Sequence, residues 1–124
     1  MPFPVAINPV SPCQPAQPGW PAHWVAEARV AGELTGFVEV NAASPGGSVE
    51  TTLFVRAEWR RQGIGTLLLD AATQWAMLRN ATALRLVCAR TDWPMRHFAE
   101  RRGARLDLAF GQIVADLPLA VKQR

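Results

Sequence analysis

The residues best suited to chemistry are crowded into one stretch, Leu53 to Asp70, which reads LFVRAEWRRQGIGTLLLD. A β-rich run ends there in a basic turn, and a helical pattern follows directly. The first N–H groups of a helix have no partner within it, and the helix dipole adds partial positive charge. Gly63 and Gly65 would let an anion approach the main chain closely. Polar side chains beside them come from Arg60, Arg61 and Thr66. We therefore predict an anion site suited to a pyrophosphate.

Two other nucleotide-binding patterns fail at the same glycines. A P-loop needs a Lys followed by Ser or Thr after its second glycine, whereas Gly65 is followed by Thr66 and Leu67. A dinucleotide fingerprint needs a third glycine three positions after Gly65, where Leu68 stands. A purely structural interpretation also stays open, in which Gly63 only relieves a tight strand-to-helix turn.

This stretch resembles the signature of the GNAT superfamily of acyl-CoA-dependent N-acyltransferases. That signature is Gln or Arg, two residues, Gly, one residue, then Gly or Ala, and it is matched by Arg60, Gly63 and Gly65. The preceding Glu58-Trp59 step is also similar, with Ala57 where the family usually has Pro. Segments 31–38 and 98–104 resemble the family's strand-turn-strand and its second-helix motif, so that the likeness spans about residues 24–117.

The resemblance implies an α+β fold with a mixed, mostly antiparallel central sheet flanked by helices, shortened at its N-terminus. It also implies that the strands Val49–Val55 and Leu84–Ala89 splay apart and that acetyl-CoA inserts its pantetheine arm between them. Its adenine end is expected near residues 92–96. The implied coenzyme contacts are Leu53, Phe54, Val55, Arg60, Arg61, Gln62, Gly63, Ile64, Gly65, Thr66, Asp92 and Met95.

The implied reaction is transfer of an acetyl group from acetyl-CoA to a primary amine of an unidentified small molecule or peptide, by direct attack in a ternary complex. Glu50 and Glu39 are the candidate general bases, although each could equally be a solvated carboxylate at a strand edge. His23 is expected at the surface. The family commonly protonates the departing thiolate with a tyrosine, but this chain has no tyrosine and has Phe98 at that position. A catalytically disabled domain that binds CoA as a sensor or assembly module is therefore the alternative hypothesis.

Hydrophobic periodicity predicts the elements that position these residues. Strands are expected over 23–30 and 33–40 around an Ala31-Gly32 turn, with Leu34, Gly36, Val38 and Val40 on one face. A helix is expected over 63–79, with its inward stripe formed by Ile64, Leu67, Leu68, Ala71, Trp75 and Leu78. A second helix should begin near Asp92 and stop at Gly103, and two strands should occupy 105–119 around Gly111.

The first 22 residues differ in composition from the rest. Seven of the ten prolines lie in residues 1–21, which predicts an extended arm with at most one short edge strand, over 5–8. We therefore divide the chain into a proline-rich arm (1–22), the acetyltransferase domain (23–119) and a short tail (120–124). GNAT proteins usually place a strand and two helices before the hairpin. Because those helices are not seen here, an uncovered sheet face and edge are expected, and with them a homodimer.

Composition excludes several classes of protein. Hydrophobic residues make up 49% of the 124, charged residues 19%, and no apolar run is long enough to span a membrane. Two cysteines and two histidines are too sparse for a structural metal site, so no metal is expected, and we expect a cytoplasmic location. The net charge is +3, and twelve of the thirteen basic residues are Arg. This bias permits a phosphorylated ligand, but the arginines are scattered, so a nucleic-acid partner is not expected.

Overall fold

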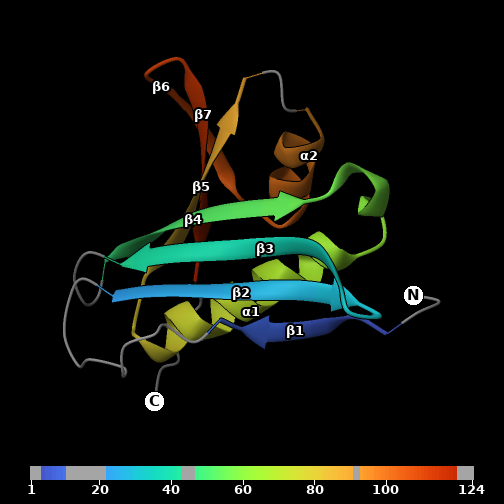
Figure 1. Cartoon of the computed structure of the whole chain (residues 1–124). Coiled ribbons are helices and arrows are strands. Elements are labelled where there is room, and N and C mark those ends of the chain that lie inside the picture. Colours follow the sequence, from blue (N-terminus) through green and yellow to red (C-terminus); the bar gives the residue numbers. More distant parts are fainter. Residues whose placement is uncertain (1–3, 11–21, 43–46, 91–92, 120–124) are drawn as a thin grey trace.

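A computed structural model describes residues 4–10, 22–42, 47–90 and 93–119. Seven strands and two α-helices form an α+β fold in which both helices lie behind one face of the sheet (Figure 1). Their bounds are β1 Ala6–Pro9, β2 Ala22–Val30, β3 Glu33–Ala42, β4 Ser48–Val55, the 3₁₀ turn η1 Ala57–Trp59, α1 Ile64–Leu78, β5 Ala83–Ala89, α2 Trp93–Arg101, β6 Arg105–Ala109 and β7 Gln112–Pro118. Each expected element is present, and β1 provides the short edge strand foreseen in the arm.

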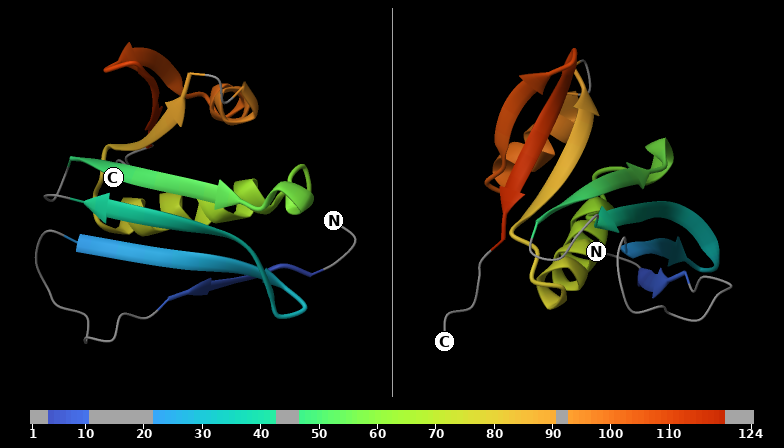
Figure 2. Two further views of the ribbon diagram at one scale, coloured as in Figure 1. Left: turned by 45° about the horizontal axis from the view of Figure 1, so that its top comes forward. Right: turned by 90° about the vertical axis from the view of Figure 1, so that its left-hand side faces the viewer.

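The strands form one sheet in the order β1-β2-β3-β4-β5-β7-β6. Every neighbouring pair is antiparallel except β4 and β5, which are parallel because α1 connects them. The mixed, mostly antiparallel sheet predicted from the sequence is therefore confirmed. Two views of the ribbon show β5, β6 and β7 turning away from β1–β4 (Figure 2).

The β2–β3 hairpin shows one departure from simple alternation. Ala28 pairs with Gly36, but the next residue, Arg29, pairs with Leu34, so Thr35 is an extra residue on β3. Thr35 is fully buried, and its hydroxyl donates to the Ala28 carbonyl at 3.0 Å. Gly36, Val38 and Val40 face inward as expected, whereas Leu34 is only half-buried because this bulge rotates it away.

Helix α1 packs on β2–β4 through a different face from the predicted one. Of the expected stripe only Ile64 and Leu68 are buried, and Leu78 is 85% exposed. The face against the sheet is completed by Leu69, Ala72 and Ala76. Nearly every position of this helix is apolar or small, so periodicity alone does not distinguish adjacent stripes. The face that contains the small alanines packs on the sheet because it allows the helix to approach closely.

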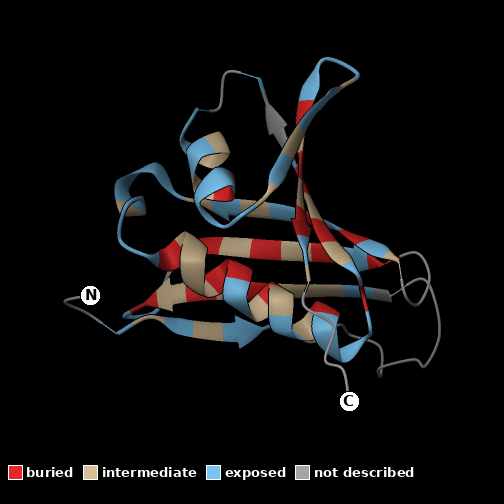
Figure 3. Cartoon of the chain, turned by 180° about the vertical axis from the view of Figure 1, so that it is seen from behind, coloured by how far each residue is buried: buried red, intermediate tan, exposed pale blue. Residues whose placement is uncertain are grey.

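The second helix covers the other half of the same face. Ala99 of α2 is fully buried and belongs to the same core as Leu84, Leu86 and Ala115 of β5 and β7. Seen from behind, the buried residues lie between the two helices and the sheet (Figure 3). No described helix covers the opposite face. Among the described residues, no helix is long and apolar enough to cross a membrane.

Candidate active site

The turn between β4 and α1 presents a row of free main-chain donors. Gly63 is the N-cap of α1 with a φ of 84°, and Arg61 has a φ of 63°. The first bond of the helix is donated by Leu67 to the Gly63 carbonyl at 3.2 Å. Residues 60 and 61 form a hydrogen-bonded turn, and after it the N–H groups of residues 63–66 find no acceptor among the described residues. A run of unpaired N–H groups at a helix N-terminus is an anion-binding arrangement.

Arginine side chains brace this turn rather than simply pointing from it. Arg60 Nε donates to the Val55 carbonyl at 3.1 Å, which ties the turn back to the end of β4. Arg56 lies 3.1 Å from Glu58 and 3.7 Å from Glu33, so both carboxylates near the turn are balanced by a cation. Arg61 makes no ion pair or hydrogen bond with a described residue. It is thus the arginine most available to an incoming phosphate.

Strands β4 and β5 pair only over their first halves, as the resemblance implied. The pairing runs from Ser48 and Ala83 to Thr51 and Leu86, and beyond it the two strands part. Residues 52–55 of β4 keep their pairing with β3 throughout. One side of this stretch is therefore left without a strand partner (Figure 2).

The antiparallel ladder decides which β4 main-chain groups face the opening. Arg56 N–H donates to the Thr35 carbonyl at 2.8 Å, so Arg56 bonds towards β3. Because successive residues alternate, Phe54 also bonds towards β3, while Leu53 and Val55 direct their N–H and carbonyl groups into the opening. The Arg60 contact to the Val55 carbonyl agrees with this assignment. Of the three predicted β4 contacts, Leu53 and Val55 are placed to bond a ligand through the main chain and Phe54 is not.

Two buried polar atoms lack a partner among the described residues, and both belong to elements that border the opening. Thr51 Oγ1 sits at the last β4–β5 pair, where the strands part, and the residue is 5% exposed. Arg96 Nε lies on α2, in the segment expected near the adenine end. A buried group without a hydrogen bond is costly, so such atoms commonly mark a ligand. Together with the free N–H groups, they make this opening fit a long, polar, anionic ligand.

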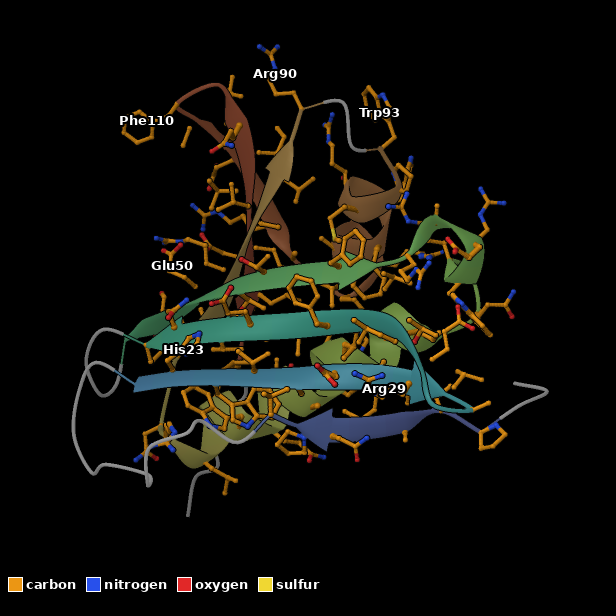
Figure 4. The ribbon with its side chains drawn as sticks, viewed as in Figure 1. His23, Arg29, Glu50, Arg90, Trp93 and Phe110 are labelled. Carbon is orange, nitrogen blue, oxygen red and sulfur yellow. The ribbon has the colours of Figure 1, made fainter. Side chains whose placement is uncertain are left out.

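The predicted bases both lie on the open face of the sheet, opposite the helices. Glu39 Oε2 is 2.7 Å from His23 Nε2, and Glu39 is directly opposite Thr52, just past the point of parting. Glu50 lies before that point, 3.8 Å from Arg85. Figure 4 shows Glu50 and His23 on this near face.

Arg85 also holds Asp116, at 3.0 Å. The hydrogen bond and the charge of Asp116 raise the pKa of Arg85 above its ordinary value, so this cation is permanent. Glu50 therefore belongs to an ion-pair row, whereas Glu39 is paired with a group that can itself accept and release a proton.

The remaining predicted residues lie on α2 or just before it. Met95 is half-buried in the first turn of α2, and Asp92 lies outside the described residues. The Phe98 ring is 3.9 Å from where a Gly65 Cβ would stand, so it packs beside the anion turn. The family's proton donor is implied at this position by the resemblance alone, and a phenyl ring has no proton to give.

Sequence reasoning missed two features of this site. Thr51 carried no motif, and only the register shows that it stands where the strands part. The pairing of His23 with Glu39 depends on the bulge at Thr35, which no sequence pattern announced. A separate hollow lies between α1, α2 and β7 and is lined in part by the Asp70–Arg102 ion pair. It is not part of the candidate active site.

Comparison with known proteins identifies the class that this fold and opening define. The profile of the acetyltransferase (GNAT) family matches residues 8–104. The chain therefore belongs to the GNAT family. A search of curated protein sequences found no match.

Solved structures of the same fold confirm the architecture. An N-acetyltransferase, PaiA, from Thermoplasma acidophilum in complex with coenzyme A has a TM-score of 0.71 at 18% identity, over 77% of this chain and 60% of its own. A nourseothricin acetyltransferase has a TM-score of 0.72 at 26% identity, over 86% and 71%. A GNAT family acetyltransferase from Elizabethkingia anophelis with acetyl-CoA bound has a TM-score of 0.71 at 15% identity, over 93% and 98%. This chain thus spans less than two thirds of the Thermoplasma protein but nearly all of the Elizabethkingia one.

Proposed function

We propose that this protein transfers the acetyl group of acetyl-CoA to a primary amine. The observation that carries the proposal is that main-chain groups lack partners at two neighbouring places, the parted edge of β4 and the first turn of α1. Structural neighbours crystallised with coenzyme A or acetyl-CoA support it. The residues that would hold the coenzyme are Thr51, Leu53 and Val55 on β4, Arg61 to Thr66 in the turn and first helical turn, and Met95 and Arg96 on α2.

The chemistry asked of these residues is mainly positioning. A neutral amine attacks the thioester carbonyl, a C–N bond forms, the C–S bond breaks, and CoA leaves as its thiolate. The amine nitrogen loses one proton, and the thiolate gains one. An unpaired β4 N–H, from Leu53 or Val55, can donate to the oxygen on which negative charge develops.

The acceptor would enter from the open face, where Glu39 lies opposite Thr52 beside the point of parting and His23, on β2, reaches Glu39 from the far side. We assign proton removal to this pair, with Glu39 as the base and His23 as its hydrogen-bond partner, and give Glu50 no direct part. Glu39→Gln should then lower kcat by about 10²-fold, within the usual range for a general base. Glu50→Gln is the matched control on the same face and should stay within about twofold of wild type. Equal losses in the two variants would contradict the assignment.

A second candidate function is a domain that binds coenzyme A without turnover. Phe98 favours it, because the ring beside Gly65 has no proton to donate to a thiolate. Thiol release separates the two candidates: acetyl-CoA is incubated with amines that include an aminoglycoside, nourseothricin and a peptide with a free N-terminus. Turnover supports the transferase, whereas micromolar CoA binding without turnover of any amine supports the binding domain.

Phe98→Tyr tests whether the missing proton donor limits the reaction. If the ring occupies the donor position, adding a hydroxyl should raise kcat about tenfold or more while the KM for acetyl-CoA changes little. Phe98→Leu serves as the control for altered packing. An unchanged or lower kcat in Phe98→Tyr would show that thiolate departure does not limit the reaction, or that the ring lies elsewhere.

A further inference from the structure

The strand β6 ends the sheet with an open main-chain edge. A two-residue turn, Phe110-Gly111, with φ values of 52° and 76°, joins β6 to β7 and closes on the Ala109–Gln112 pair. In such a hairpin the closing pair is hydrogen-bonded and the bonded pairs then alternate. Leu106 and Leu108 therefore direct their N–H and carbonyl groups away from β7, where no described residue meets them.

The opposite edge of the sheet is protected and this one is not. Strand β1 has four residues, includes Pro9 and follows Pro4, so it offers few donors. In contrast, β6 has no proline and carries exposed apolar side chains at its end. Leu108 is 61% exposed, and Phe110 is completely exposed at the tip (Figure 4). An open edge beside exposed hydrophobic residues is an interaction surface.

The charges on β6 indicate what binds there. Arg105 and Asp107 lie on the open face, and the side chain of Arg105 is 83% exposed. They approach each other only to 3.9 Å. A strand with Arg and Asp two positions apart is complementary to itself in the antiparallel direction, because the order of charges is reversed in the second copy.

We propose that β6 pairs with β6 of a second copy of this chain, antiparallel, with Leu106 opposite the partner's Leu106. This register sets Arg105 opposite the partner's Asp107, and by symmetry the same ion pair forms twice. Shifting it by two residues places either two Asp107 or two Arg105 side chains opposite each other, which is repulsive. Shifting it by one residue places main-chain groups that point towards the partner opposite groups that point back to the partner's β7, so hydrogen bonds cannot form between them.

The rest of the sheet fits this arrangement. One cross-strand row on the open face alternates in charge through Glu50, Arg85, Asp116 and Arg105, and the partner's Asp107 would continue it. On the other face Leu106 would meet its own copy, and Leu108 would lie opposite the partner's Ala104. The two β-sheets would thereby become one, and the exposed leucine would be covered.

Charge reversal tests the register directly. Arg105→Asp and Asp107→Arg should each place like charges opposite one another and weaken the dimer at least about tenfold. An equimolar mixture of the two variants should form a heterodimer, because each Asp then faces an Arg. The double variant R105D/D107R should form a homodimer again.

Sedimentation velocity at low ionic strength gives the readout, with the 13.6 kDa monomer against twice that mass, and circular dichroism checks that each variant is folded. A wild-type protein that stays monomeric up to its solubility limit overturns the proposal. So do single variants that remain dimeric, or a mixture of dissociated variants that does not associate.

Discussion

At the scale of single residues, Gly63 is the N-cap of α1 and lies in the proposed anion site. Its φ of 84° lies in the left-handed region, and the N–H groups that follow it belong to the first turn of the helix, which holds no acceptor for them. A side chain at this position would be strained and would occupy the space of the bound anion. The sequence singled out Gly63 by its spacing from Arg60 and Gly65 before a helical pattern, and its positive φ also agrees with the purely structural interpretation.

Gly63→Asp should lower the affinity for coenzyme A at least about 100-fold, equivalent to about 2.7 kcal/mol, through steric block and charge repulsion. Titration calorimetry measures the loss. Gly103→Asp is the matched control, since Gly103 has a φ of 88° and open space around it but follows α2. Similar losses in both variants would mean that backbone strain, rather than the site, explains the effect.

At the scale of elements, the free edge of β4 alternates residue by residue. Amide hydrogen exchange should therefore differ among the N–H groups of three neighbouring β4 residues. In the free protein the N–H groups of Leu53 and Val55 should exchange quickly, and coenzyme A should slow both. Phe54 should be protected in both states because its N–H bonds to β3. Slowing of Phe54 alone, or of none of the three, would contradict coenzyme binding along this edge.

Two glycines show how closely the elements must approach. A Cβ on Gly36 would lie 2.5 Å from the Phe54 carbonyl oxygen, so β3 or β4 would have to move. A Cβ on Gly65 would meet Val55 and Phe98 at ordinary contact distances of 3.8–3.9 Å. Gly36→Ala should then cost about 1–3 kcal/mol of unfolding free energy, whereas Gly65→Ala, inside a helix, should be neutral or stabilising by about 1 kcal/mol. Denaturant unfolding of the two variants measures the difference, and equal stabilities would contradict it.

The helices and strands also show which parts of the fold the sequence could predict and which it could not. Strand and helix bounds were predicted within one or two residues, because Gly63, Gly103 and Gly111 mark the ends of elements. The prediction of which face of α1 is buried was wrong, since neighbouring apolar stripes differ only in how well they fit the sheet. The pairing of His23 with Glu39 was missed because register across β2 and β3 depends on one bulge at Thr35.

At the scale of the whole molecule, helices cover one face of the sheet, and the other carries charged residues together with the Phe37–Phe54 ring pair. The two halves of the sheet, β1–β4 and β5–β7–β6, share only the four β4–β5 pairs. The proposed coenzyme site lies where these halves part, and it uses residues of β4, α1 and α2. The edge at β6 is separated from β4 by both β5 and β7. Coenzyme binding and self-association should therefore be independent.

Asp107→Arg tests that independence, because it removes the proposed dimer without touching the coenzyme site. Its affinity for coenzyme A should remain within about twofold of wild type, since no free energy couples the two sites. Gly63→Asp provides the reciprocal variant, which should lose coenzyme binding and keep the mass of the wild-type assembly. Calorimetry and sedimentation on the same two proteins measure both properties. A fall in coenzyme affinity that accompanies dissociation of the dimer would show instead that the second copy completes the site, and that one chain does not hold the coenzyme by itself.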